Sequence, residues 1–283
     1  MTFGPNPWQQ TNWDWRAAGN FIGGGAGSGL IAASALAGAS GPASRWLMLV
    51  GMALIGCGLL CVWLEIGRPL RALHVFFNPH TSWMTREALV APLLLGLALA
   101  AAFRVPMATA LAGLAALAFA YCQGRILQAA RGIPAWRHPR TTPLIVACAL
   151  AEGAGLFWLL AGWSAGGPVM TGVFAALVLA RALLWGAWHG SIAETAAPRA
   201  LAALDRPGKQ LLWSGSALPL VLIALAAIGI ASAVLMALAG LLVAASGANF
   251  KFALITRGAF NQGFALTRLP VRGVPRASAN RPS

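Results

Sequence analysis

The chain has 283 residues, of which 59% are hydrophobic and only 9% are charged, and its mean hydropathy is +0.73. Apolar runs of about 18 or more residues recur, each long enough to cross roughly 30 Å of hydrocarbon, and they are continuously apolar rather than alternating. An ordinary soluble domain and strands as spans are therefore excluded. The net charge of +14 would indicate nucleic-acid binding in a soluble protein. In a membrane protein it sets the orientation of the loops, so no nucleic-acid partner is expected.

The apolar runs predict an all-α polytopic membrane protein. We expect eight transmembrane helices, at about 17–38, 45–65, 87–103, 106–128, 143–163, 168–190, 210–229 and 231–255. The last two come from one run of about twice the length of a span, which we divide near Gly229–Ser232. Residues 1–255 then form the membrane domain, and 256–283 form a basic, Pro/Arg/Ser-rich tail. The polar, Trp-rich N-terminus has no basic n-region, so no removable signal peptide is expected.

The distribution of basic residues predicts the orientation. With eight spans, both termini lie on one side, together with the loops at 66–86, 129–142 and 191–209. That side collects seventeen of the twenty Lys and Arg residues, Lys251 among them, whereas the other side holds only Arg45 and Arg104. By the positive-inside rule, both termini are cytoplasmic in a bacterial inner membrane.

Haem is not expected in this chain. A b-type haem needs two histidines on facing helices at membrane depth. Of the four histidines, His74, His80 and His138 fall in predicted loops, and only His189 falls in a span. The four cysteines lie in apolar helices without C-x-x-C spacing, so iron–sulfur or zinc ligation by this chain is not expected either.

A quinone pocket is the first candidate site. A quinone needs an apolar slot, donors for its carbonyls and a route for protons. Glu65 and Glu87, at the ends of two predicted spans, are the candidates for proton transfer. Candidates for positioning the ring lie at the same level: Arg16, Asn20, Arg68, His74, Arg86, Tyr121 and Arg125. The alternative is that these residues are loop anchors and helix caps, although carboxylates inside span ends are unfavourable without a function.

A second candidate lies deeper in the membrane. Glu152 and Arg181 fall near the middle of two neighbouring spans, and we expect them to pair, since either charge is unfavourable alone. His189 lies on the same helix face as Arg181. The group is either a proton path or a structural ion pair that fixes helix register.

The segment from Trp63 to Glu87 resembles the connection between the second and third helices of NrfD-like proteins, the membrane anchors of dimethyl sulfoxide reductase, polysulfide reductase and related complexes. The family pattern is approximately H-L-G-R-P-x-R-A followed by S-W-x-S-R-E, and this chain reads L-E-I-G-R-P-L-R-A and then S-W-M-T-R-E. A-R-G-I-P-A-W, from Ala130 to Trp136, is a further match. Glu65 departs from the pattern, because many relatives have histidine at that position.

The resemblance implies an anchor without haem. In the family, such anchors hold an iron–sulfur subunit with [4Fe-4S] clusters, which carries a molybdenum bis-pterin catalytic subunit, and exchange electrons with ubiquinone or menaquinone. Glu87 matches the acidic residue of quinone chemistry, and Arg16 and Asn20 match residues that line the head group. Arg68, Pro69 and Arg86 match the framework.

A cytoplasmic docking face favours cytoplasmic substrates. The N-terminal segment P-W-Q-Q-T-N-W-D-W-R-A-A-G-N-F is most similar to anchors of phenylacetyl-CoA:acceptor oxidoreductases, and anchors of cytoplasmic sulfite dehydrogenases are the close alternative. Two other classes stay open, a secondary transporter that uses Glu152 and Arg181, and a purely structural anchor. Against transport, the sequence has no inverted repeat and no paired broken helices.

Overall fold

The computed structural model describes residues 4–38, 41–66, 69–162, 166–230 and 232–264. Within these ranges every regular element is helical, apart from one isolated β-bridge, which confirms the all-α class. The elements are α1 (Trp15–Leu36), α2 (Gly41–Glu65), η1 (Pro69–Phe77), α3 (Trp83–Ala102), α4 (Ala108–Ala129), α5 (Pro134–Arg137), α6 (Thr141–Ala161), α7 (Gly167–Ile192), α8 (Pro198–Leu212), η3 (Trp213–Ala217), α9 (Leu218–Ala227) and α10 (Ser232–Thr256).

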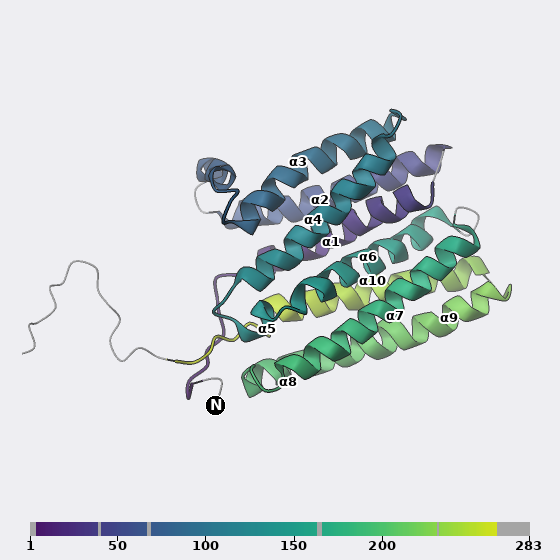
Figure 1. The fold of residues 1–283 in the computed structure, drawn as a ribbon. Coiled ribbons are helices and arrows are strands. Elements are labelled where there is room, and N and C mark those ends of the chain that lie inside the picture. Colours follow the sequence, from purple (N-terminus) through teal and green to yellow (C-terminus); the bar gives the residue numbers. More distant parts are fainter. Residues whose placement is uncertain (1–3, 39–40, 67–68, 163–165, 231, 265–283) are drawn as a thin grey trace, which may run out of the picture.

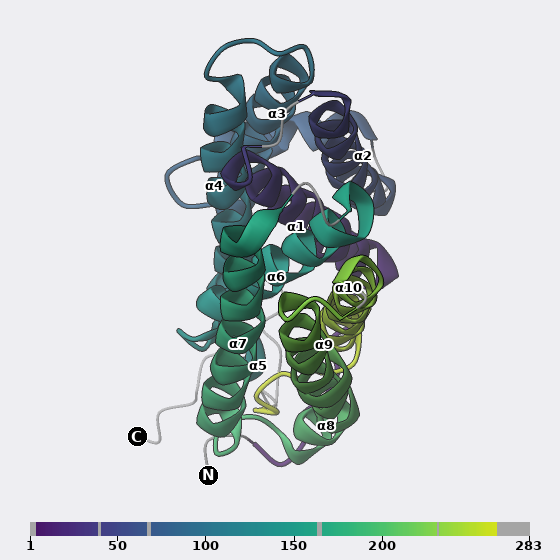
Figure 2. The same cartoon turned by 90° about the vertical axis from the view of Figure 1, so that its right-hand side faces the viewer.

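The long helices lie side by side in one elongated bundle (Figure 1). Seen after a quarter turn, α2, α3 and α4 lie at the top and α7, α8 and α9 at the bottom, with α1, α6 and α10 between them (Figure 2). Helix α1 contacts α2, α4, α6 and α10, and α6 contacts α1, α4, α7 and α10. Helices α1 and α6 therefore form the centre of the bundle.

Seven helical segments among the described residues are long and apolar enough to cross a membrane. They are 43–65, 83–102, 108–129, 141–161, 167–192, 198–227 and 232–256. A polytopic membrane protein is thereby confirmed, but by length and composition the count is seven rather than the predicted eight. Helix α1 is of similar length, but Arg16, Asn20 and its many glycines make it less apolar than the others.

The prediction of a loop at 191–209 is wrong for most of its length, because α8 begins at Pro198. Asp205 and Lys209 place charges within this segment. In the structure they lie on the exposed side of α8, paired at 2.8 Å one turn apart. Buried Ala200, Leu204 and Leu211 recur at helical spacing on the opposite side. The predicted break near Gly229 is confirmed, since α9 ends at Ala227 and α10 begins at Ser232.

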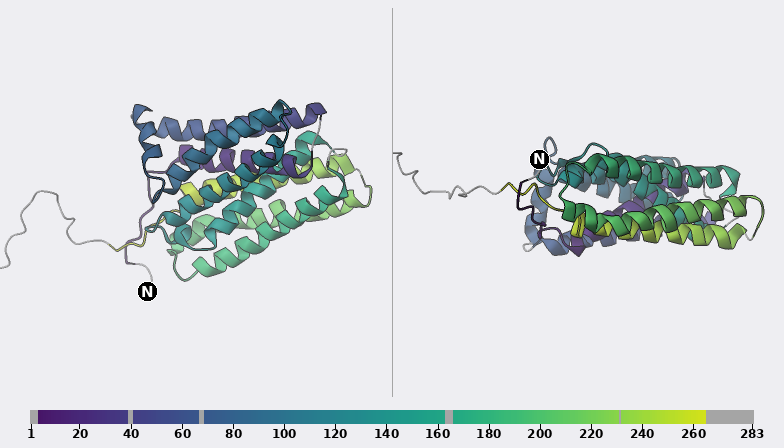
Figure 3. Two further views of the ribbon diagram at one scale, coloured as in Figure 1. Left: turned by 45° about the horizontal axis from the view of Figure 1, so that its top comes forward. Right: turned by 90° about the horizontal axis from the view of Figure 1, so that it is seen from below.

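The segments next to the two ends of the described chain pair with each other. Gln9 and Phe260 form an antiparallel bridge, and the Gln10 amide donates to the Ala259 carbonyl at 2.9 Å. The Gln10 side chain also donates to the Ile255 carbonyl of α10 at 3.1 Å. Both segments therefore lie at the same end of the bundle, as the two views of Figure 3 show.

Helix α1 packs closely on its neighbours because it is rich in glycine. A Cβ on Gly27 would lie 2.5 Å from the Gly51 carbonyl oxygen of α2, and a Cβ on Gly29 would overlap the Ala149 carbonyl of α6. Small residues allow such close contact between membrane helices. The small residues of FIGGGAGSG predict close helix approach, and in the structure this approach occurs on two sides of α1, toward α2 and toward α6.

Candidate functional site

A mostly apolar cavity of about 270 Å³ lies between α1, α2, α3 and α4, at the end of the bundle where the terminal segments pair. Three polar side chains interrupt its apolar walls: Asn20, Glu65 and Glu87. The other lining residues are Trp13, Ala17, Phe21, Val62, Ile66, Met84 and Ile126. Three of the residues predicted from the sequence to bind quinone or transfer protons are thus brought together around one cavity.

The cavity holds a buried carboxylate beside a buried amide. Helix α3 begins at Trp83 because the Ser82 hydroxyl accepts from the Thr85 amide at 3.3 Å. This start places Glu87 inside the bundle rather than in the preceding loop. Asn20 Nδ2 donates to Glu87 Oε1 at 3.3 Å, and only 7% of Glu87 is exposed. Asn20 Oδ1 is buried without a hydrogen-bond partner among the described residues, which is unusual for a buried polar atom.

Two glycines of α1 open its backbone to side chains from other helices. Gln123 Nε2 donates to the Asn20 carbonyl at 3.0 Å, and Lys251 Nζ donates to the Phe21 carbonyl at 2.7 Å. Each side chain occupies the space that a Cβ would take at the residue four positions later, Gly24 or Gly25. A larger residue there would cover these carbonyls, so the glycines allow Gln123 and Lys251 to reach the backbone of α1.

Glu65 ends α2 at the rim of the cavity and is partly exposed. Arg16, predicted to position a quinone, points instead to the end of α2, where Nη1 donates to the Leu64 carbonyl at 3.0 Å. It also pairs with Asp14 at 2.9 Å, and this hydrogen bonding lowers the pKa of Asp14 below its usual value. Arg16 is not among the residues that line the cavity.

Three further predicted residues surround Trp83 rather than the cavity. The Arg86 guanidinium lies 4.1 Å and that of Arg125 4.5 Å from the centre of the Trp83 ring. Tyr121 stands edge-on to the same ring at 5.7 Å and accepts from Arg125 Nη1 at 3.2 Å. Arg86 also donates to the carbonyls of Pro79 and His80, at 2.9 and 2.8 Å. These residues form a second site. The sequence analysis predicted one pocket, but its residues belong to two separate sites.

The remaining predicted quinone residues lie elsewhere. His74 is exposed on η1, with its ring 5.6 Å from that of Phe77, and does not line the cavity. Arg68 lies outside the residues that the structure describes.

The predicted pairing of Glu152 with Arg181 is wrong. Glu152 pairs instead with Lys251, whose Nζ lies 2.7 Å from Oε2, and both side chains are almost fully buried. Arg181 donates to the Val243 carbonyl at 2.9 Å and to the Gly215 carbonyl. Gly215 lies in η3, where the π-helical turn frees a carbonyl that Arg181 can reach. Arg181 is thus satisfied mainly by backbone oxygens.

His189 stacks on Trp185 of the same helix, with ring centres 4.9 Å apart and an angle of 16°. The predicted common face holds in part, since Arg181 and Trp185 are buried and His189 is partly exposed. His189 forms no ion pair with Glu152 among the described residues. In the structure, His189 is therefore not part of the buried polar group that contains Glu152.

The sequence reasoning missed Gln123 and misplaced Lys251. Lys251 was counted with the cytoplasmic charges because it falls near the end of a span, yet it is fully buried. The signal was present, because lysine and glutamine inside an apolar run are rare unless they have a polar partner. Their partners could not be read from the sequence, since both bind backbone carbonyls of α1.

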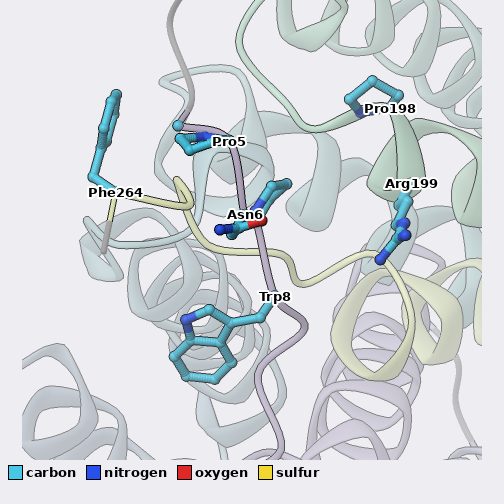
Figure 4. Close-up of a pocket in the computed structure, with 8 residues that line it drawn as sticks. Pro5, Asn6, Trp8, Pro198, Arg199 and Phe264 are labelled. Carbon is cyan, nitrogen blue, oxygen red and sulfur yellow. The ribbon is translucent and has the colours of Figure 1, made fainter. Parts of the chain in front are cut away.

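A larger hollow lies where the terminal segments meet the start of α8 (Figure 4). It measures about 750 Å³ and is lined by Gly4, Pro5, Asn6, Pro7, Trp8, Pro198, Arg199 and Phe264. No carboxylate, histidine or cysteine is among these lining residues, so the hollow offers no proton-transfer group. The smaller cavity around Glu87 is therefore the candidate site.

No group of three or more His, Cys, Asp or Glu side chains within the described ranges is arranged to hold a metal ion. Of the four free cysteines, Cys122 and Cys148 are buried and Cys57 is exposed. In comparisons with known proteins, no protein-family description matches this chain, and no curated protein matches it.

Proposed function

We propose that this chain is the membrane anchor and quinone-reactive electron-transfer subunit of a molybdenum and iron–sulfur oxidoreductase complex. The observation that supports it best is the cavity around Glu87, an apolar slot with a buried carboxylate that is hydrogen-bonded to an amide and a second carboxylate at its rim. This is the chemistry that a quinone head group requires at the end of a membrane bundle. The resemblance of 63–87 to NrfD-like anchors supports the same function.

The cavity residues suit a quinone ring in either redox state. The apolar walls hold the ring, and the unused acceptor Asn20 Oδ1 can accept a hydrogen bond from a hydroxyl of the reduced form. When Glu87 is ionised it can accept a proton from the reduced form, and when it is protonated it can donate to a carbonyl of the oxidised form. Glu65 at the partly exposed rim then exchanges the proton with water. Bound quinone would supply the two-electron chemistry, and the chain supplies binding and proton transfer.

We further propose eight crossings, with both termini in the cytoplasm of a bacterium and α1 as the eighth. Seven crossings would place the terminal segments on opposite faces, whereas Gln9 and Phe260 pair at one end of the bundle. Helix α1 runs between spanning helices, which fits a crossing (Figure 1). The excess of arginine at this end favours the cytoplasmic side of the inner membrane.

The partners in this proposal are an iron–sulfur subunit and a molybdenum catalytic subunit that dock on the cytoplasmic face. The cavity lies at that end, so a [4Fe-4S] cluster of the docked subunit can exchange electrons with a quinone bound there. The N-terminal resemblance favours oxidation of phenylacetyl-CoA in the catalytic subunit, with sulfite as the alternative substrate.

The substitution Glu87→Gln tests this function. It keeps the shape and removes the titratable group, so quinone turnover by the purified complex should fall by about a hundredfold or more. Glu194→Gln, which changes an exposed acid outside the cavity, is the matched control and should leave turnover unchanged. Wild-type turnover in the Glu87 variant would contradict the proposal, provided that iron and molybdenum still copurify with it.

A secondary transporter is the second candidate, favoured by the fully buried Glu152–Lys251 pair. Charged groups at this depth often mark ion pathways. Uptake by the isolated chain in liposomes separates the two candidates, because a transporter catalyses it alone and an anchor does not.

A further inference from the structure

A concave basic site lies beside Trp83, separate from the cavity around Glu87. It measures about 500 Å³ and is lined by Thr81, Trp83, Arg125, Gln128, Ala129, Arg131 and Arg137. Three guanidinium groups thus face one depression. The proposed electron-transfer function does not use these residues.

The positive charges of this site have no carboxylate partner. All six acidic residues of the chain lie within the described ranges, and none of them lines the site. The side chain of Arg131 has no partner among the described residues, and Arg125 Nε is buried without one. Three guanidiniums without a carboxylate partner in one depression favour an anion.

One further side chain of the site, Gln128, is available as a donor. Gln128 Oε1 accepts from the Thr142 hydroxyl at 2.7 Å, which leaves the amide NH₂ of Gln128 for a ligand. The Arg131 carbonyl accepts from Arg137 Nη1 at 3.2 Å. Gln262 also holds Arg137, at 2.9 Å when its amide is turned to face the guanidinium. A site with donors and little free acceptor capacity fits a phosphate.

The location of the site favours a phosphate carried by a lipid. Trp83 begins one membrane-spanning segment and Ala129 ends another, so the site lies at the depth of lipid head groups. Exposed Tyr121 and Leu117 lie on the same face of α4 as Arg125, one and two turns further into the membrane. A soluble acidic peptide would use the basic site but not this apolar face of α4.

We infer that this site binds the phosphate of an anionic phospholipid, with an acyl chain along the exposed face of α4. A net anionic head group fits better than a zwitterionic one, because the lining has no carboxylate for an amine. Basic pockets between membrane helices bind such head groups. The lipid would act as a resident ligand at the end of the bundle where arginine gathers.

Lipid retention measured by native mass spectrometry tests the inference on the whole chain. Protein extracted from nanodiscs of phosphatidylcholine with phosphatidylglycerol should retain phosphatidylglycerol, and protein from phosphatidylcholine alone should retain no lipid at this site. Arg131→Gln changes an exposed side chain without partners among the described residues, and it should weaken lipid retention about fivefold. The double substitution Arg131→Gln with Arg137→Gln should weaken lipid retention about 25-fold. The control Arg199→Gln with Arg206→Gln removes two exposed charges at the same end and should retain the wild-type amount.

Three results would overturn the inference. One is retention by Arg131→Gln that equals the wild type, and another is an equal loss in the Arg199 and Arg206 control. The third comes from a phosphatidylcholine sample with inorganic phosphate. If phosphate alone protects the protein against thermal unfolding as well as phosphatidylglycerol does, the site binds free anions and not lipid. Because none of these measurements involves quinone turnover, failure here is distinct from failure of the electron-transfer proposal.

Discussion

At the scale of single residues, the most unusual feature is a lysine that is fully buried near the end of α10. Lys251 binds Glu152 at 2.7 Å and the Phe21 carbonyl at 2.7 Å, so its ammonium group links α10 to α6 and α1. A buried ion pair adds little net stability over an apolar pair of similar volume, but the loss of one partner leaves an uncompensated charge. The pair therefore specifies which helices meet.

Lys251→Met should destabilise the protein strongly, by about 3–5 kcal/mol, because Glu152 is left buried without its partner. The free energy of unfolding in detergent, measured by denaturant titration, checks this. Changing Glu152 to Met as well should restore most of the loss. Lys209→Met is the control, since its pair with Asp205 is exposed and exposed pairs contribute little. Equal effects of the Lys251 and Lys209 substitutions would contradict the structural role of the buried pair.

At the scale of elements, direct backbone-to-backbone contacts at glycines hold the central helices of the bundle together. Gly29 of α1 and Gly153 of α6 pack backbone against backbone, and a Cβ on either would overlap main-chain atoms of the other helix. Gly155 of α6 and Gly240 of α10 form a second contact of this kind. Backbones cannot move aside as flexible side chains can, so these contacts fix the distance between helices.

Gly153→Ala should therefore destabilise the bundle by about 1–3 kcal/mol, although alanine is the better helix former. Thermal unfolding in detergent measures the effect. Gly186→Ala in α7 is the matched control, because a Cβ there meets nothing within 4 Å and should be neutral or slightly stabilising. A stable Gly153 variant would mean that α1 and α6 are less closely packed than described.

Elements are also where sequence reasoning succeeds and fails. Length and hydropathy predicted the long helices and the break near Gly229, because burial in lipid requires long apolar runs. Helix α8 was missed because its period of 3.6 residues alternates polar and apolar faces, which a search for continuous runs does not detect. For the site, depth along the bundle was predictable, since Asn20, Glu65 and Glu87 do meet. The rotation of each helix about its own axis is not specified by the sequence. It decides which way Arg16, Arg86 and Arg125 point, and which residue pairs with Glu152.

At the scale of the whole molecule, the polar features gather at one end of the bundle. The paired terminal segments, the cavity and the basic site lie there, together with most of the arginines of the described ranges. The opposite end has the short connection between α3 and α4, around Val105. Orientation can therefore be tested with one position at each end.

With the native cysteines replaced by alanine, a membrane-impermeant maleimide should label Val105→Cys in spheroplasts and Asn6→Cys only in inverted vesicles. Both positions are exposed, so labelling reports the side of the membrane. The expectation follows from eight crossings with the arginine-rich end inside. Labelling of both positions from the same side would contradict it. Labelling with the sides exchanged would leave eight crossings intact and reverse the orientation.

The bridge between Gln9 and Phe260 also has a consequence for the order of assembly during synthesis. The segment that holds Trp13 against the cavity is made first, but its partners, Ile255 at the end of α10 and Phe260 just beyond it, are made last. The ring of Trp13 lies 5.0 Å from that of Trp136, from the middle of the chain. The position of Trp13 in the cavity wall thus depends on contacts among segments made early, in the middle and last. A chain stopped before α10 would lack the late contacts that hold the segment before α1, and Trp13 with it, at the cavity.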